Sequence, residues 1–379
     1  MYFIVLLGIV SLFGDVTYEG ARSVIGPYLA TLGASASIVG LISGIGEFSG
    51  YALRLASGYF ADRTKAYWLF TFIGYGLLVS IPLLAFAGYW QLAAVLIILE
   101  RMGKAIRSPA RDTMLSYATK EVGRGWGFAV HEALDQIGAI IGPIVFSVVL
   151  LSHAGYREGF TMLWIPALLS VTILAMARKK VPSPRKLETP GEESKQHVKG
   201  KLPRVFWLYT IFSLFSVAGF ANFQLISYHL KVQAIVPDAR IPIIYAVAMG
   251  VDAVAALLAG KTYDRIGLES LLAVPLLTLP IPFLAFSYDY KMVLTGMVLW
   301  GVVMGIQETI MRAAIADITP VERRGFAYGI FNTVYGASWF LGSALIGLLY
   351  EHSINHLIMF VVAMELISIP LFFLVRKTA

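Results

Sequence analysis

The segment GYFADRTK, residues 58–65, ends the second long apolar stretch of the chain. A shortened copy, GKTYDRI at residues 260–266, ends another apolar stretch 202 residues later. A second pair of similar segments aligns without a gap at an offset of 200 residues: RGWGFAVHEALDQIGAIIG at 124–142 and RGFAYGIFNTVYGASWFLG at 324–342. Copies of two segments at nearly the same spacing indicate that the chain is an internal duplication.

The composition of the chain is typical of a polytopic membrane protein. Of its 379 residues 58% are hydrophobic and 14% charged, whereas a soluble domain has about 45 to 50% apolar and about 25% charged residues. Apolar segments of about 20 residues, long enough to cross a bilayer, recur along the whole chain. We predict twelve membrane-spanning helices, at about residues 2–30, 36–61, 66–88, 91–115, 124–151, 158–177, 204–230, 240–262, 268–287, 291–317, 325–350 and 354–375.

One long polar segment, Arg178 to Arg204, divides the spans into six and six. It is rich in Pro and charged residues and has too few apolar residues to form a core, so we expect a flexible linker. The prediction is an all-α membrane protein with two pseudo-symmetric six-helix bundles. The N-terminal bundle covers residues 1–177, the cytoplasmic linker 178–203 and the C-terminal bundle 204–379.

The distribution of basic residues predicts an orientation. Twenty Lys and Arg fall in the linker, at the C-terminus and in the turns on the linker side, against four in the turns on the other side. By the positive-inside rule, the linker and both termini are cytoplasmic, and we expect an integral protein of the cytoplasmic (inner) membrane. The net charge of +7 therefore reflects topology and the lipid bilayer as partner, not nucleic-acid binding.

Ionisable residues recur inside the predicted spans, mostly in the first half. They are Asp15, Glu19, Arg22, Glu47, Arg54, Glu100, Arg101, Lys104, Arg107, His131, Glu132 and Asp135 in the first half, and Asp252, Glu308 and Arg312 in the second. A charge at mid-membrane costs about 2.5 to 3.5 kcal/mol, so a dozen facing lipid would exceed a typical folding stability of about 5 to 15 kcal/mol. We expect these side chains to face one another, or water, inside the bundles.

Helical spacing places Asp15, Glu19 and Arg22 on one face of the first span. In the first half, six carboxylates face five Lys and Arg, which leaves at least one acid without its own cation and open to protonation. A network of ion pairs that only locks helices together is the alternative. Spans 3, 6 and 9 lack central ionisable residues and span 12 has only Glu365, so we expect every third helix to face lipid.

The two halves, the basic linker and the loop at residues 58–65 together resemble the major facilitator superfamily over essentially the whole chain. The loop is similar to that family's signature G-x-x-x-D-R-x-x-R/K, with Gly58, Asp62, Arg63 and a basic end at Lys65. The resemblance implies that Asp62 is a gate latch rather than a substrate ligand. The second copy keeps Gly260, Asp264 and Arg265 without the basic end, which implies a weaker latch, and Arg111 and Asp112 lie where they could contact Asp62.

Two further motifs resemble the family. GAIIGP on span 5, with Gly138, Gly142 and Pro143, is similar to the start of a motif that bends this helix at the domain interface in exporter-type members. The rest of that motif is missing, and a packing face of small residues with a Pro kink is the alternative. On span 4, Arg101 is the nearest match to the family's intramembrane Arg.

The resemblance implies a secondary transporter whose halves rock about a site near the midplane, lined mainly by spans 1, 4, 7 and 10. We expect a proton-coupled exporter (antiporter) that uses the charges of the first half, with gating by the motifs above. Polar substrate contacts are expected from Tyr18, Asn222, Gln224, Gln307, Glu308, Arg312 and Asn332. The alternatives are a proton-coupled uptake symporter for an anionic metabolite, favoured by the bases Arg22, Arg101, Lys104 and Arg107, and a receptor on a transporter fold.

Enzyme chemistry has no support in the sequence. The chain has no Cys, no H-E-x-x-H motif, no phosphate-binding loop and only six scattered His. We therefore expect no cofactor and no metal. The expected partners are a small-molecule substrate, protons as the coupling ion and the bilayer, and the protein is expected to be a monomer.

Overall fold

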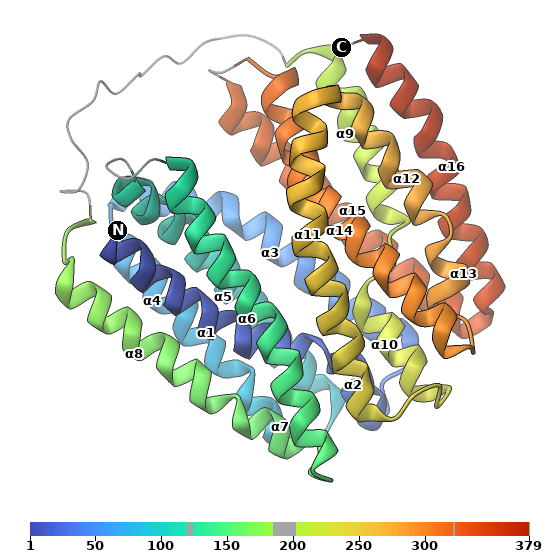
Figure 1. Ribbon diagram of the computed structural model, residues 1–379, viewed down its shortest axis with the longest axis horizontal. Helices are drawn as coiled ribbons and strands as arrows, with labels where there is room; N and C mark the ends of the chain where they lie inside the picture. Colours follow the sequence, from blue (N-terminus) through green and yellow to red (C-terminus); the bar gives the residue numbers. More distant parts are fainter. Residues whose placement is uncertain (120–123, 185–201, 321–322, 379) are drawn as a thin grey trace. The chain divides into compact units, whose positions relative to one another are not determined.

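The computed structural model describes residues 1–119, 124–184, 202–320 and 323–378 (Figure 1). In this part of the chain the regular structure is helical, with no strand. The central part of the predicted linker, residues 185–201, lies outside the described residues. The prediction of an all-α protein is confirmed.

The chain divides into two compact units. The first unit contains residues 1–33, 49–194 and 238–246, and the second contains residues 34–48, 195–237 and 247–379. The beginning of the helix α3 (Ala36–Thr64) thus belongs to the second unit and the beginning of α11 (Ile241–Ile266) to the first. The boundaries of the duplicated halves, 1–177 and 204–379, remain a prediction from the sequence.

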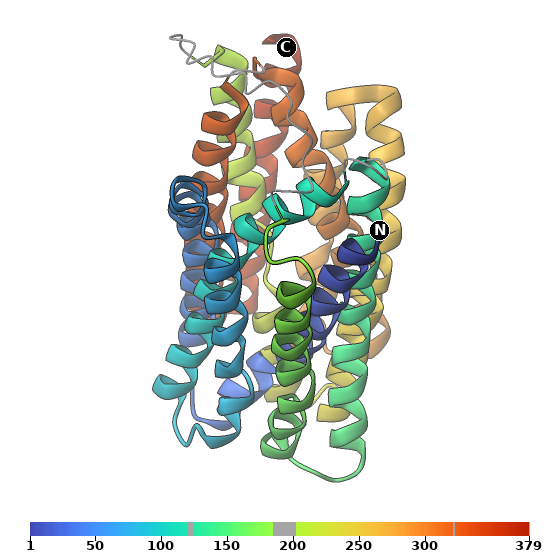
Figure 2. The same cartoon turned by 90° about the vertical axis from the view of Figure 1, so that its left-hand side faces the viewer.

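The helices of the first half begin at Tyr2. They are α1 (Tyr2–Arg22), α2 (Ile25–Thr31), α3 (Ala36–Thr64), α4 (Tyr67–Gly76), η1 (Leu77–Ser80), η2 (Pro82–Phe86), α5 (Trp90–Thr119), α6 (Arg124–Leu151), α7 (Tyr156–Met162) and α8 (Trp164–Lys180). In the first unit α1 lies between α6 and α8 and packs against both, and α4 packs against α5 (Figures 1 and 2). On the charged face of α1, Glu19 and Arg22 are buried and Asp15 is half-buried.

The helices of the second half repeat this order. They are α9 (Arg204–Ala218), α10 (Phe223–Val232), η4 (Asp238–Arg240), α11 (Ile241–Ile266), η5 (Gly267–Leu272), α12 (Ala273–Thr278), α13 (Ile281–Ala285), α14 (Tyr290–Ile318), α15 (Arg324–His352) and α16 (Ile354–Thr378). Within the second unit α9 packs against α15 and α16.

Ten helical stretches of the described chain are long and apolar enough to span a membrane. They contain eleven predicted spans, because spans 8 and 9 run together in Asp238–Ala285. The remaining predicted span, the fourth, is α5. This helix has 30 residues and is thus about 45 Å long, but its many charged residues make it too polar to be counted among the ten apolar stretches. All twelve predicted spans are thus helical in the structure.

Five of the spans that we predicted as continuous are interrupted, namely spans 1, 3, 6, 7 and 9. The first breaks at Ser23 and Val24, between α1 and α2, and the seventh breaks over residues 219–222, between α9 and α10. At the first break the Ser23 hydroxyl donates to the Gly20 carbonyl at 2.6 Å, a local bond that competes with helix continuation. At the second, Asn222 caps α10, its side-chain oxygen accepting from the Leu225 amide at 2.8 Å.

Candidate functional site

The charged residues of α1 meet partners inside the first unit. Arg22 forms an ion pair with Glu19 (Nη1 to Oε1, 3.6 Å). The hydroxyl of Tyr245 donates to the other Glu19 oxygen at 2.6 Å. Both members of the ion pair are buried. The prediction that Glu19 and Arg22 point into the protein is confirmed.

The second ion pair lies within α5. Arg107 Nη2 lies 3.3 Å from Glu100 Oε1, and Arg107 Nη1 donates to the Gly74 carbonyl at 3.2 Å. The guanidinium also lies 4.9 Å from the centre of the Tyr75 ring. Arg107 is 2% exposed and Glu100 1%. These contacts favour the structural alternative for this pair, a lock between α4 and α5.

Three cations surround one aromatic ring. Lys104 Nζ lies 4.3 Å from the centre of the Tyr18 ring, and the guanidinium carbons of Arg101 and Arg22 lie at 4.5 and 5.8 Å. The face of an aromatic ring attracts cations, more strongly where water is excluded, and Tyr18 is 1% exposed. Three of the four bases predicted to suit an anion are therefore together, and we call them, with Tyr18, the Tyr18 cluster.

Two acids act on each other across the contact between α1 and α6. Asp15 on α1 and Asp135 on α6 interact electrostatically with each other and both with Lys104. Arg111 is the further base near Asp135; it donates through Nη1 to the Ser11 hydroxyl at 2.6 Å. The structure thus brings together two carboxyl groups that lie 120 residues apart in sequence.

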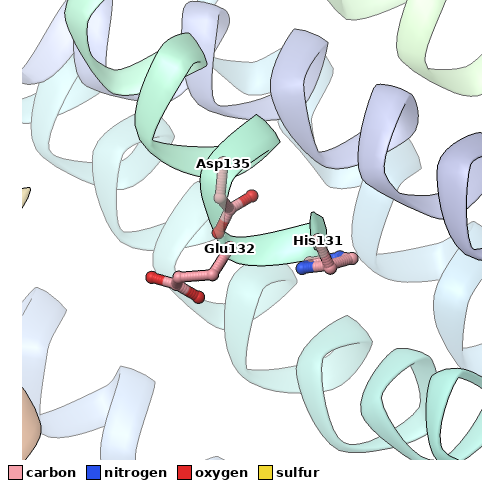
Figure 3. A group of neighbouring side chains, drawn as sticks. All are labelled: His131, Glu132 and Asp135. Atoms are coloured by element: carbon pink, nitrogen blue, oxygen red, sulfur yellow. The ribbon is translucent and has the colours of Figure 1, made fainter. Parts of the chain in front are cut away.

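His131, Glu132 and Asp135 lie on neighbouring positions of α6 (Figure 3). Their possible ligand atoms lie within 4.8 Å of one another, close enough to hold a metal ion. Histidine and carboxylate ligands suit several divalent cations. The guanidinium of Arg111 acts electrostatically on both His131 and Asp135 and opposes a second cation there. We therefore retain His131 and Asp135 as members of the charge network.

The glycines of GAIIGP face α1. A Cβ atom on Gly138 would lie 2.4 Å from the Leu12 carbonyl oxygen, and one on Gly142 would lie 2.4 Å from the Val16 oxygen. Pro143 lies inside α6, which continues to Leu151. The packing alternative describes these contacts, and the exporter-type role of the motif remains a prediction.

The two charges of span 2 fall in different units. Glu47, half-buried, belongs to the second unit, and Arg54 to the first. The Arg54 guanidinium lies 5.0 Å from the centre of the Tyr51 ring on the same helix. Their predicted role in proton coupling stays a prediction.

The predicted substrate contacts of the second half have several local roles. Asn222 is the cap of α10, and Gln307 accepts from the Tyr335 hydroxyl at 3.2 Å. Asn222, Gln224 and Gln307 are each 4% exposed or less, and each keeps one side-chain polar atom without a hydrogen bond in the described part of the chain. Glu308 and Asn332 are half-buried, and Arg312 is exposed.

The predicted latch residues make tyrosine contacts. Asp62 accepts from the Tyr67 hydroxyl at 3.1 Å, which in turn lies 3.2 Å from the Tyr117 hydroxyl. Arg63 donates to Tyr59 at 3.3 Å. Instead of the expected contact with Asp62, Arg111 pairs with Asp112, at 3.0 Å from Arg111 Nη2.

The copy of the latch has a similar contact. Tyr263 donates to Asp317 at 2.7 Å, joining the ends of α11 and α14. The neighbouring Asp264 and Arg265 are exposed. In both copies a tyrosine hydroxyl therefore binds an aspartate at the helix ends.

The glycine of each copy lies against a neighbouring helix. A Cβ atom on Gly58 would lie 3.4 Å from the Cβ of Pro109 on α5, and one on Gly260 would lie 3.7 Å from Thr309 on α14. Both distances are ordinary van der Waals contacts. The two glycines therefore occupy matching places in the duplicated halves.

Sequence reasoning missed the aromatic partners of these groups. Tyr75 and Tyr245 contact buried charges, and Trp300 donates to the Ala221 carbonyl at 2.8 Å, at the break in span 7. Phe220 stacks on Trp300 with ring centres 5.4 Å apart. The only signal was that Tyr and Trp occur in the middle of apolar spans, where their polar atoms need a partner.

A cavity of about 810 Å³ lies in the second unit, between α11, η5, α12 and α14. Its lining is mainly aliphatic, including Val247, Leu258 and Leu276. The predicted substrate contacts Gln307, Glu308 and Arg312 on α14 are not among the residues that line it. It is therefore separate from the polar groups described above.

Comparison with known sequences identifies the family. The family model described as Major Facilitator Superfamily matches residues 5–267 and 233–379. An uncharacterized protein of Mycobacterium tuberculosis is 41% identical over 99% of this chain and 93% of its own length, as is one of Mycobacterium bovis. An uncharacterized MFS-type transporter of Methanocaldococcus jannaschii is 26% identical over 92% of this chain and 88% of its own length.

Solved structures share the fold at low sequence identity. A bacterial homologue of the human lysosomal transporter Spinster, in an inward-facing and occupied conformation, has a TM-score of 0.76 and 15% identity over 100% of this chain and 97% of that chain. The nucleoside transporter NupG has a TM-score of 0.73 and 15% identity over 100% of this chain and 99% of that chain. With the family model matching both halves, the chain belongs to the major facilitator superfamily, as a membrane transporter with two six-helix halves.

Proposed function

We propose that this transporter is proton-coupled and works as an exporter, exchanging a small molecule for protons by alternating access. The pair of acids Asp15 and Asp135 carries the proposal. Asp15 and Asp135 are half-buried, and two interacting carboxyl groups resist being ionised together, so they can share one proton. Lys104 acts electrostatically on both of them.

Protonation of this pair changes the charge balance between α1, α5 and α6. With the proton bound, the pair presents one negative charge instead of two to Lys104, and the attraction of this base to the two acids falls. A ligand or proton shifts a conformational equilibrium only through a difference in its binding to the two states. The three helices that meet at the pair supply such a difference, because a relative movement separates the acids from their bases.

Two features of the chain bear on the direction of transport. The resemblance of GAIIGP to the exporter-type motif favours export. The Tyr18 cluster favours the second candidate, proton-coupled uptake of an anionic metabolite, because its three cations could bind a carboxylate or phosphate. The similar structures include a nucleoside transporter, which makes nucleosides and their anionic derivatives useful members of a first screen.

The test is reconstitution of the protein in proteoliposomes with an internal pH dye. Cationic, anionic and neutral compounds are screened for substrate-induced proton movement under each gradient direction. Asp15→Asn and Asp135→Asn should abolish proton movement. The control is Asp289→Asn, because Asp289 is an exposed N-cap and Asn caps a helix equally well.

The outcomes separate the candidates. Proton movement opposite to the compound, lost in both acid variants, supports antiport. Proton movement in the same direction as the compound supports the uptake symporter and contradicts the exporter. Compound flux without proton movement in the unmodified protein contradicts proton coupling in either form.

A further inference from the structure

Glu365 is a buried carboxyl group that the proposed mechanism does not use. It lies on α16, the twelfth span, which we expected to face lipid. Its exposed fraction is 0%, and it turns toward α9 within the second unit. The expectation that span 12 faces lipid is therefore wrong for this face of α16, on which Glu365 points into the protein interior.

The polar groups that face Glu365 are few. The hydroxyls of Ser216 on α9 and Ser368 on α16 each lie 3.4 Å from Oε2. The other oxygen, Oε1, is buried and has no hydrogen-bond partner in the described part of the chain. Among the residues that the structure describes, no charged group of the neighbouring helices acts on the carboxyl, and the hydroxyls of the two serines are its polar surroundings.

Oε1 packs against the break in span 7. A Cβ atom on Gly219, the first residue after α9, would lie 2.6 Å from Oε1 and 3.1 Å from the Cβ of Met364. The glycine therefore leaves the space that the carboxyl oxygen occupies. The end of α9 cannot move relative to α16 without changing the surroundings of Oε1.

The duplication gives this position a counterpart in the first half. At the offset of 202 residues given by the copies of residues 58–65 and by SLF at 11–13 and 213–215, Gly219 corresponds to Thr17, and Asp15 and Glu19 correspond to Val217 and Ala221. Span 7 thus lacks both acids that span 1 carries near its own break. Glu365 brings a carboxyl group to the end of α9 from a different helix, without a cation such as Arg22, which pairs with Glu19 in span 1.

These surroundings favour the neutral acid. An ionised carboxylate out of water requires a cation or several strong donors, and Glu365 has two long contacts to hydroxyls, both on Oε2. A proton on Oε1 removes the charge and leaves the contacts of Oε2 in place. An isolated ionised acid in a membrane span is the costlier state.

We propose that Glu365 is a second proton-binding site, which holds a proton on Oε1 at the break in span 7 and releases it when the end of α9 moves and water reaches the oxygen. The release breaks the Oε1–H bond and leaves the electron pair on the carboxylate, with water accepting the proton. Its role in a transport cycle rests on the proposed proton-coupled function. The protonation itself does not, and it can be measured without substrate.

The experiment is infrared spectroscopy of the full-length protein in lipid membranes, titrated from neutral to alkaline pH. We expect the spectrum at neutral pH to contain a carbonyl band of a buried protonated carboxyl that is lost in Glu365→Gln. The control is Glu351→Gln on α15, because Glu351 is exposed and accepts from the Ser37 amide at 2.8 Å. That variant should keep the band. A spectrum of Glu365→Gln with the band unchanged overturns the proposal.

A second variant tests the proposal in the case that Glu365→Gln does not fold. Gly219→Ala keeps the carboxyl but displaces Oε1, so the band should shift in frequency while the Glu351→Gln spectrum stays unshifted. An unshifted band in Gly219→Ala also overturns the proposal. Reaction with a hydrophobic carbodiimide, which modifies protonated carboxyl groups in apolar surroundings, should label Glu365 at neutral pH, as read by peptide mass; an unlabelled Glu365 contradicts the proposal.

The two proposals fail separately. If substrate moves without protons but the band of Glu365 is present, proton coupling is wrong and the proton site stands. If transport is proton-coupled through Asp15 and Asp135 but the band is absent, the Glu365 site is wrong and the transport proposal stands. If both hold, Glu365→Gln should change the pH dependence of transport.

Discussion

At the scale of single residues, the pair Glu100–Arg107 is enclosed by protein on all sides, unlike the ion pair Glu269–Arg376. The latter joins exposed side chains at 2.6 Å. Glu100→Gln would leave the Arg107 cation buried without its acid, so we expect a loss of about 3 to 5 kcal/mol in the free energy of unfolding. Glu269→Gln should cost at most about 1 kcal/mol. Thermal unfolding in detergent compares the two variants.

The outcome also decides the role of Glu100. If Glu100→Gln unfolds at the same temperature as the unmodified protein but loses proton movement in proteoliposomes, the pair belongs to proton coupling and not to structure. The double variant Glu100→Gln with Arg107→Met removes both charges and should recover much of the lost stability.

The Tyr18 cluster allows a second prediction at this scale. Tyr18→Phe keeps the ring under Arg101, Lys104 and Arg22, whereas Tyr18→Leu removes it. A buried cation–π contact contributes about 2 kcal/mol, so Tyr18→Leu should lower the unfolding temperature well below that of Tyr18→Phe. Equal unfolding temperatures would show that the ring does not hold the cations. The sequence predicted these bases for the interior, but ring partners depend on three-dimensional packing.

At the scale of helices, the contact between α1 and α6 depends on Gly142. Its Cα lies so close to α1 that an added Cβ would be 2.4 Å from the Val16 oxygen and 2.7 Å from the Gly20 nitrogen. These are backbone atoms that cannot turn away, so we expect Gly142→Ala to cost about 1 to 3 kcal/mol of stability. Gly250→Ala is the matched control, since nothing lies within 4 Å of its Cβ position and Ala in a helix interior gains about 0.5 to 1 kcal/mol.

The measurement is the fraction of each variant that remains monodisperse in detergent after heating. If Gly142→Ala is as stable as Gly250→Ala, the close contact between α1 and α6 does not contribute to the stability of the protein. Sequence spacing predicted the buried face of α1 with Glu19 and Arg22 and the small-residue face of α6. It was wrong for Glu132 and Arg312, which are exposed. The sequence did not predict the breaks in spans 1 and 7, because nothing distinguishes Ser23 and Asn222 from the other polar residues of these spans. Only their hydrogen bonds show that the helices end there.

At the scale of the whole molecule, the duplication predicted the fold because it depends on repeated segments and not on single contacts. GYFADRTK and its copy indicate two similar halves, and this prediction needs no knowledge of how the helices pack. The duplication did not predict that Glu365 is buried, because Gly219, which it contacts, follows α9, distant in sequence, and has no charge to signal the contact. The duplication therefore does not predict contacts between helices that are distant in sequence.

Because the chain contains no Cys, the predicted orientation in the membrane can be tested directly with single Cys substitutions. A single Cys replacing Arg157 is expected on the outer side and one replacing Lys377 on the cytoplasmic side, from the positive-inside distribution. A membrane-impermeant thiol reagent added to intact cells should label Arg157→Cys, and should label Lys377→Cys only after the cells are opened. Both sites are exposed in the structure, so the difference reports the membrane side. The reverse pattern would place the linker and both termini outside and would invert the direction assigned to every transport measurement above.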